Sequence, residues 1–262
     1  MINFVTNISS PESKIALFRS LFRGREDVYP VRFESQKTGR SGYAPACANE
    51  WVRGLCEKPR VKCSVCQHRK LLPVTDEIIR CHLSGSDERG RPFIMGVYPM
   101  LLDETCWFLA LDFDGNQWHN DVKAVLRSCD KHSLPAVLER SRSGNGGHLW
   151  LFFEQAVPAR LARNLGSFLL TDAMECRPEI GLKSYDRLFP NQDTLPKGGF
   201  GNLIALPLQS QARANGNSLF VDAEFRPVPD QWGFLSTVAR IAVGKCEALV
   251  REDESKGRIT GV

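Results

Sequence analysis

The first seventy residues show one helical pattern and one stretch without a regular pattern. Ser10 and Pro11 precede apolar residues at helical spacing, and Gly24 stops the pattern, so a short capped helix is predicted there. Between Cys47 and Arg69 no apolar period is sustained, and the stretch is rich in cysteine. We interpret this stretch as an insertion that a metal ion organises.

The centre of the chain alternates between strand and helix patterns. Apolar runs that end in turn residues predict strands, and apolar residues three and four apart predict helices. The predicted elements are, in chain order, a strand at 107–114, a helix at 121–132, strands at 136–140 and 148–153, a helix that starts at Pro158, and a strand at 202–209. This order of strand, helix, strand, strand, helix, strand is typical of the ferredoxin-like fold, which RNA-recognition modules share. We therefore predict an α+β fold.

These patterns predict three parts. Residues 1–105 form an N-terminal α/β unit with a zinc-binding insertion at about 47–68, residues 106–245 form the RNA-recognition-like unit, and residues 246–262 form a polar tail or linker. Within the second part, residues 181–201 are predicted to be a long loop, which in a compact domain is usually functional or disordered.

Composition and cysteine content restrict the class of protein. The chain has 262 residues, of which 42% are hydrophobic, so a sizeable core is expected. No apolar run reaches the roughly 18 residues of a membrane span, and no export signal is recognised, so a soluble, cytoplasmic protein without a membrane partner is predicted. Nine cysteines cannot all pair, and four of them cluster, which favours reduced thiols and a metal site over a disulfide framework.

Charge is unevenly distributed along the chain. The net charge is +4, but residues 19–70 contain 12 lysines and arginines against 5 acidic residues. A basic flank beside an acidic site suits a protein that holds a polyanionic nucleic acid near a metal ion, although a solvated basic surface has the same composition.

Asp112 and Asp114 are the first candidate catalytic residues. Strand residues two apart point to the same face, so both carboxylates can converge on one or two divalent cations. Hard oxygen ligands suit Mg²⁺ or Mn²⁺ together with substrate phosphates. An isolated pair of this kind more often caps a turn, but here both acids end an apolar strand, where active sites are common.

A glycine-rich turn that leads to His148 is the second candidate feature. Ser143 and Gly146 lie in this turn, whose backbone amides can approach a phosphate closely. In the ferredoxin-like order the first and third strands are neighbours, so His148 is expected beside Asp112. A packed histidine after a flexible hairpin is the alternative interpretation.

A third acid and a loop lysine complete the candidate phosphate site. Asp222, in the short strand-like stretch 220–224, is the preferred third acid, and Glu224 is the weaker choice. Lys197 lies among glycines and could grip a phosphate, or it is an ordinary exposed lysine.

Four cysteines have the spacing C-x8-C-x6-C-x2-C. Cys47, Cys56, Cys63 and Cys66 together supply four tetrahedral ligands for a structural Zn²⁺, and His68 is a possible substitute ligand. Buried reduced cysteines are the competing explanation. Lysines and arginines surround these thiols, so the stretch could also offer a basic surface to nucleic acid.

In the order and spacing of several stretches, the chain resembles the archaeo-eukaryotic primase superfamily. The resemblance is close to the branch found in TOTE conflict systems and CRISPR-associated primase-polymerases. The matching stretches are Phe18–Arg32, Cys47–Cys66, Phe108–Gly115, Ser141–His148 and Lys197–Gln209, which span most of residues 10–225.

The resemblance implies a primase-polymerase that joins nucleoside triphosphates or deoxynucleoside triphosphates on a DNA or RNA template and primer with two Mg²⁺ or Mn²⁺ ions. It assigns Asp112 and Asp114 to the metal pair, His148 to nucleotide contact and Asp222 to the third acidic motif. It also implies an active site between the two units, and helicase and nuclease modules as partners in the same or a neighbouring polypeptide.

Two other functions compete with this one. The sequence Leu111–Gly115 also looks like the nucleophile motif of haloacid-dehalogenase-like phosphohydrolases, in which Asp112 would attack phosphorus, although Asn116 replaces the usual threonine. The second alternative is a non-catalytic, zinc-containing nucleic-acid-binding module.

Overall fold

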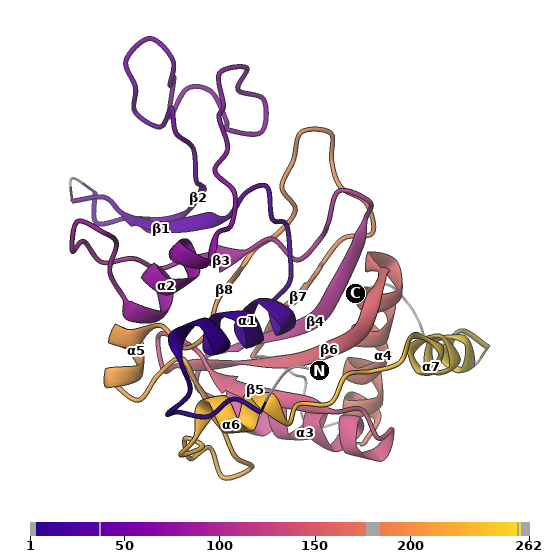
Figure 1. Cartoon of the computed structure of the whole chain (residues 1–262). Helices are drawn as coiled ribbons and strands as arrows, with labels where there is room; N and C mark the ends of the chain where they lie inside the picture. The colour runs from indigo at the N-terminus through magenta and orange to yellow at the C-terminus, as the bar shows by residue number, and fades with distance from the viewer. Residues whose placement is uncertain (1–3, 37, 177–183, 256, 258–262) are drawn as a thin grey trace.

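A computed structural model describes residues 4–36, 38–176, 184–255 and 257. It has a mixed α+β architecture (Figure 1). The elements are, in chain order, α1 (Pro11–Leu21), β1 (Pro30–Glu34), β2 (Ser41–Pro45), α2 (Asp76–Ser84), β3 (Gly96–Val97), β4 (Thr105–Asp114), α3 (Trp118–Lys131), β5 (Ala136–Arg140), β6 (Gly146–Pro158), α4 (Ala159–Cys176), β7 (Tyr185–Phe189), β8 (Ile204–Ala205), α5 (Ser210–Ala214), β9 (Leu219–Val221), α6 (Gln231–Ser236) and α7 (Val243–Ser255).

A five-stranded antiparallel sheet lies at the centre of the molecule. Its strand order is β7-β4-β6-β5-β9. The long strands β4 and β6 are paired from Thr105 opposite Pro158 to Asp114 opposite Gly146. The predicted strands at 107–114, 136–140 and 148–153 are thus present, and the first and third of them are neighbours.

Both faces of this sheet are covered, which explains why β4 is apolar at consecutive positions. Leu109 and Leu111 face a core formed with α3 and α4. Phe108 and Ala110 face a second core, formed with the N-terminal segment and the segment around β8 and β9. A strand buried on both faces needs apolar residues throughout, because alternation suits only a strand with one wet face.

The N-terminal segment packs on the second face. Helix α1 begins where predicted: the Ser10 hydroxyl accepts a hydrogen bond from the Ser13 N–H at 3.2 Å, and Pro11 follows the cap. Its apolar side brings Phe18 into the core, and Phe22 beyond it meets the Trp150 ring edge-on at 5.0 Å. The strands β1 and β2 form a hairpin above this helix (Figure 1).

Two predictions for residues 181–209 are wrong. The predicted loop contains β7, which is the edge strand beside β4; residues 181–183 lie outside the described residues. The predicted strand at 202–209 is reduced to β8, which pairs with β3 away from the main sheet. Pro207 has no N–H to continue a ladder, whereas Tyr185, Leu188 and Phe189 are strand formers that complete the free edge of β4.

The C-terminal part begins as helix rather than tail. Residues 243–255 form α7, which packs against α4, so the predicted tail at 246–262 starts inside a helix. Its residues 256 and 258–262 lie outside the described residues. Among the described residues no helix is both long and apolar enough to cross a membrane.

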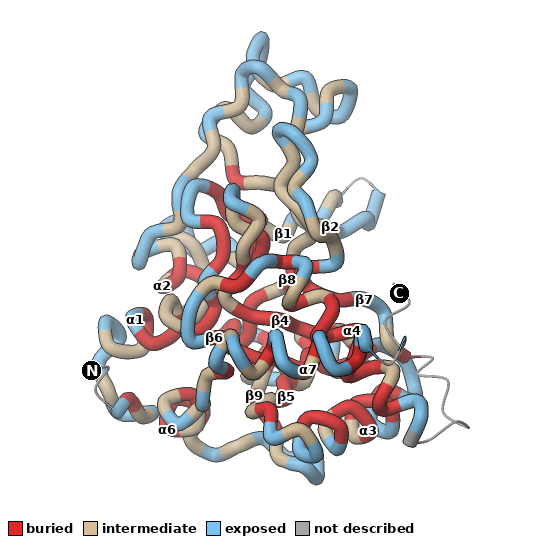
Figure 2. Tube along the Cα trace, turned by 90° about the vertical axis from the view of Figure 1, so that its right-hand side faces the viewer, coloured by how far each residue is buried: buried red, intermediate tan, exposed pale blue. Residues whose placement is uncertain are grey.

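Residues 47–71, which we call the cysteine lobe, project from the body above β1 and β2 (Figure 1). The lobe consists of turns and bends, and none of its residues is buried. Figure 2 shows it as exposed and intermediate residues only.

Candidate active site

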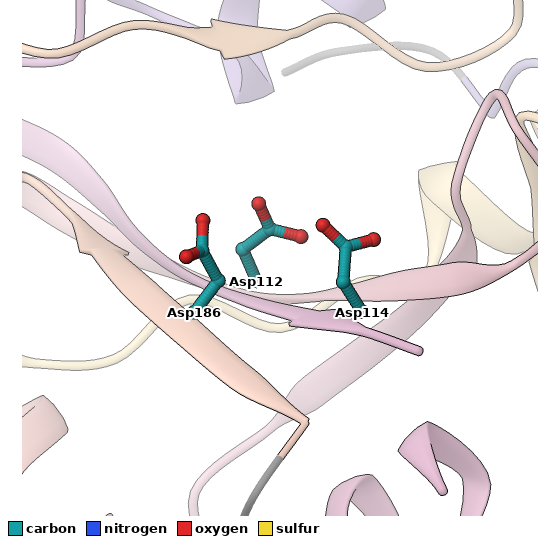
Figure 3. A group of neighbouring side chains, drawn as sticks. All are labelled: Asp112, Asp114 and Asp186. Atoms are coloured by element: carbon teal, nitrogen blue, oxygen red, sulfur yellow. The ribbon is translucent and has the colours of Figure 1, made fainter. Parts of the chain in front are cut away.

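Three carboxylates converge at the end of the central strand. Asp112 and Asp114 lie two residues apart on β4, and both point to the same face of the sheet, as the sequence predicts (Figure 3). Asp186, from β7, points to the same place. One ligand oxygen from each carboxylate lies within 4.8 Å of the others, a spacing that can hold divalent cations.

An irregularity in the β4–β7 ladder accounts for the direction of Asp186. Asp112 pairs with Arg187 and Phe113 pairs with Tyr185, so Asp186 is an extra residue between successive pairs. Such a bulge redirects a side chain, and here it turns the Asp186 carboxylate to the face that carries Asp112. The Arg187 guanidinium forms an ion pair with Asp186 and adds a positive charge at the rim.

Asp222, the predicted third acid, is not part of this group. It follows β9, which is the opposite edge strand of the sheet. Strands β9 and β4 are separated by three strand spacings, about 14 Å in total. The carboxylates of Asp222 and Glu224 both pair with Arg226, at 2.9 and 3.0 Å, and close an exposed turn. The sequence offered two acids at the end of a strand, but that strand is on the wrong edge.

His148 lies beside the acids, where the sequence places it. It pairs with Asp112 across the β4–β6 ladder, and its Nε2 is 3.5 Å from the Asp112 Oδ1. On the other side its Nδ1 is 2.9 Å from the Glu139 Oε2, which also accepts a hydrogen bond from the Trp150 indole at 3.0 Å. The Ser218 hydroxyl donates to the other Glu139 oxygen at 3.4 Å.

Burial and charge shift the pKa values of this group. Burial alone would lower the pKa of His148, but the Glu139 carboxylate, together with the charges of Asp112 and Asp114, more than offsets this and raises it to about 9. Burial raises the pKa of Asp112 to about 6; the His148 charge opposes this shift, and the nearby Asp114 and Asp186 charges add to it. The acids repel one another here, so a bound cation would be strongly favoured.

The turn between β5 and β6 closes the site beside Asp114. A Cβ on Gly146 would lie 2.3 Å from the Phe113 carbonyl oxygen and 2.5 Å from the Asp114 Oδ1, so only glycine fits there. The Ser143 hydroxyl accepts a hydrogen bond from the Asn145 N–H at 3.3 Å and lies 3.1 Å from the Ser141 hydroxyl. The predicted nucleotide-binding turn therefore borders the acid group.

Lys197 lies in a loop at the other end of β4. The Leu195 N–H donates to the Glu104 carboxylate at 3.0 Å, just before β4 begins. Glu104 is eight residues from Asp112, or about 26 Å along a strand. The structure thus does not bring the loop of Lys197 to the acid group.

The four cysteines of the lobe share one small cavity, which His68 also lines. All four thiols are free, and the Lys70 N–H points to the Cys47 sulfur at 3.3 Å. Thiolates are ligands that structural Zn²⁺ takes, but among the described residues only Asp112, Asp114 and Asp186 bring three ligand atoms within 4.8 Å of one another, so the thiols are not drawn together as a closed metal site.

Comparison of the sequence with models of protein families gives a match to a family of primase domains. Residues 13–249 match the model of the archaeo-eukaryotic primase domain of TOTE conflict systems. The chain belongs to this family. Its members are primases and polymerases, so the match supports nucleotidyltransferase activity for this primase domain.

Other comparisons with this primase domain are more distant. A similar solved structure is the polymerase domain of ligase D from Mycobacterium tuberculosis in complex with DNA. It has a TM-score of 0.40 and 10% sequence identity, over 95% of this chain and 90% of that one. No curated protein matches the chain.

Sequence reasoning missed Asp186, Arg187 and Glu139 of this primase domain. Asp186 sits between strand formers, Tyr185 before it and Leu188 after it, and that pattern was the available signal for a strand. Glu139 could have been noticed as an acid that directly follows the apolar run Ala136–Leu138, because a buried carboxylate needs partners.

Proposed function

We propose that this primase domain is a template-directed primase-polymerase that extends a nucleic-acid chain from nucleoside or deoxynucleoside triphosphates. A 3′-hydroxyl oxygen forms a bond to the α-phosphorus, the bond from that phosphorus to the bridging oxygen breaks, pyrophosphate leaves, and the hydroxyl proton is lost. The observation that carries the proposal is the convergence of Asp112, Asp114 and Asp186.

The three carboxylates would hold two Mg²⁺ or Mn²⁺ ions. The donor set fits these ions, because the oxygens come from two adjacent strands and lie within 4.8 Å of one another. When bound, such ions lower the pKa of the attacking hydroxyl and neutralise the triphosphate. The protein's own contribution is to fix the acids on paired strands, where they need no rearrangement.

His148 and the turn before it would bind the triphosphate. Glu139 accepts a hydrogen bond from Nδ1, which leaves the Nε2–H of a protonated His148 facing the acids, where it can donate to a phosphate oxygen. The amides of the turn, with Ser143, border the same space.

The fold supports the same proposal. We infer that β4, α3, β5, β6, α4 and β7 form an RNA-recognition-like unit, supported by the strand order β7-β4-β6-β5. We also propose that the domain acts with helicase and nuclease modules in a defence system, supported by its family.

An incorporation assay tests this function. With a primed single-stranded template, triphosphates and Mg²⁺ or Mn²⁺, we expect primer extension and stoichiometric pyrophosphate release. Without added Mg²⁺ or Mn²⁺ both should be absent, and adding either ion should restore them, because the ions are the charge-neutralising partners of the triphosphate. Gel analysis of extended primers and a pyrophosphate assay give the two readouts.

Other outcomes point to the competing functions. Phosphate release with an acid-stable aspartyl-phosphate at Asp112 and no primer extension would indicate a phosphohydrolase. Nucleic-acid binding with neither product, under every metal and triphosphate tested, would indicate a non-catalytic module.

We further propose that Cys47, Cys56, Cys63 and Cys66 bind a structural Zn²⁺. Their common cavity and the Lys70 amide directed at Cys47 support this ligand set. A lobe with no buried residues has little apolar core, so a bound metal would supply the stability that a core does not.

A Cys63→Ser variant is expected to lose this metal and to loosen the lobe. Removing one ligand weakens zinc binding, and zinc binding is coupled to folding of small metal-organised segments. Metal analysis should find about one zinc per wild-type chain and little in the variant, and limited proteolysis should cut the variant within 47–71. Cys81→Ser, which alters a buried cysteine on α2, should keep the zinc. Equal zinc in wild type and Cys63→Ser would contradict the site.

A further inference from the structure

We infer that the cysteine lobe is a binding surface for single-stranded nucleic acid, with Trp51 as its stacking platform. This inference extends the proposed function to the place where a strand is held, and it does not depend on chemistry at the acid group. Four observations on the described residues carry it.

The lobe exposes large apolar side chains. Trp51 is 69% exposed and Val65 is 68% exposed, and Val52 and Leu55 are also exposed. These four lie within fifteen residues of one another, whereas the other exposed large apolar side chains are scattered over the described chain. Single exposed apolar residues are normal, but a group of them marks an interaction site.

The backbone holds Trp51 in an unfavourable conformation. Its φ is 61°, in the left-handed region that bulky residues rarely adopt. Burial of the indole does not offset this cost, because most of the ring is in water. Consecutive turns, with hydrogen bonds from Glu50 N–H to the Cys47 carbonyl and from Cys56 N–H to the Val52 carbonyl, keep the residue in place. Strain of this kind is most often retained at functional positions.

The lobe is basic, and one of its cations lies over the ring. Residues 47–71 contain six lysines and arginines and two glutamates, so the lobe has an excess of four positive charges, equal to that of the whole chain. The Lys58 ammonium lies 5.8 Å from the Trp51 ring centre and is held by Glu50 at 2.6 Å. The exposed side chains Arg53, Arg60 and Lys62 form no ion pair with the described residues.

The lobe contacts the loop that contains Gly198. The Arg69 Nη1 donates to the carbonyl oxygens of Ser64, at 2.9 Å, and of Gly198, at 2.8 Å. A Cβ on Gly198 would lie 2.7 Å from the Ser64 carbonyl oxygen, so the two segments are in close contact. A strand bound at the lobe therefore lies beside the loop that contains Gly198.

Single-stranded nucleic acid fits this surface better than a protein partner. Unpaired bases stack on an aromatic ring, and the phosphates pair with cations beside it. The centres of protein interfaces are instead depleted in charged residues, and lysine in particular. A double helix would offer no free base faces to the indole.

The test is a binding titration without added Mg²⁺ or Mn²⁺ and without a chelator, which separates binding from catalysis and leaves a structural zinc ion in place. A fluorescein-labelled oligothymidine of about 12 nucleotides matches the site size of such surfaces. With the full chain, Trp51→Ala is expected to raise Kd by about 5- to 100-fold, the range for loss of base stacking. Trp51→Phe should restore most of the affinity. Changing Arg53, Arg60 and Lys62 together to Gln should reduce the slope of log Kd against log salt by about 2.

Two controls keep the result interpretable. Phe4→Ala removes another exposed aromatic ring, 65% exposed and outside the lobe, and should leave Kd unchanged. Trp51→Gly relieves the backbone strain, so it should weaken binding without lowering the melting temperature. An unchanged Kd for Trp51→Ala would overturn the inference, and the surface would then fit a protein partner. Oligothymidine binding that needs Trp51 in a protein unable to extend primers would contradict only the proposed function.

Discussion

An enzyme that carries Asp186→Asn is expected to lose primer extension by roughly 10³-fold, the upper range for removal of one group that stabilises charge in the transition state. The amide keeps the shape of the side chain but removes the negative charge that completes the group with Asp112 and Asp114. The measurement is the single-turnover rate of extension at saturating triphosphate, and Asp112→Asn should show a loss of similar size.

Asp222→Asn is the matched control for this experiment. Asp222 is also an aspartate that ends or flanks a strand of the same sheet, but it pairs with Arg226 at an exposed turn on the far edge. Its activity should stay within about 2-fold of wild type, since exposed ion pairs contribute little. Inactivity of Asp222→Asn together with normal activity of Asp186→Asn would refute the assignment of the third acid.

The second large effect is expected at Glu139, as a positioning residue. Glu139→Gln has nearly the same shape, and its carbonyl oxygen can still accept from His148 and Trp150, but it removes the negative charge that favours the protonated form of the buried imidazole. We expect extension to slow by about 10- to 100-fold, as when the partner of a functional histidine is lost. The apparent KM for the triphosphate should rise as well, because a neutral imidazole binds a phosphate oxygen less strongly than the protonated form.

A double-mutant cycle distinguishes this role from a general loss of stability. Glu139→Gln should cost little activity in a His148→Gln background, because its effect passes through the imidazole. Thermal unfolding reports stability separately, and Ser218→Ala, which removes only the weaker contact to Glu139 at 3.4 Å, is the mild control. Additive losses in the double variant would show that Glu139 does not act through His148.

The sequence predicted much of the central sheet because its signals were local. The apolar run of β4, the glycine-rich turn and the order of elements were enough to place His148 opposite Asp112. Each of these depends on residues close together in the chain or on a common connection rule. The helices α1 and α3 were likewise found from their apolar spacing, α1 with its cap.

The position of Asp186 beside Asp112 depends on a bulge, which the alternation of apolar and polar residues along a strand cannot reveal. In a regular strand Asp186 would share a face with Leu188, which packs in the core on the other side of the sheet. Only the extra residue in the ladder turns the carboxylate toward Asp112. The partner of His148 was missed for a different reason: Glu139 is opposite His148 across β5 and β6, and that register cannot be read before the strands are paired.

The position of β7 has a thermodynamic consequence. This strand is an edge strand of the sheet and pairs only with β4 there. Local opening of an edge strand needs less free energy than opening of a central strand. A cation bound by both Asp186 and Asp112 would connect β7 to β4. Its binding free energy would therefore also oppose local separation of β7 from the sheet. Cation binding and pairing of β7 with β4 would thus be linked. Local opening of β7 would abolish the cation site, and with it catalysis, before the whole molecule unfolds.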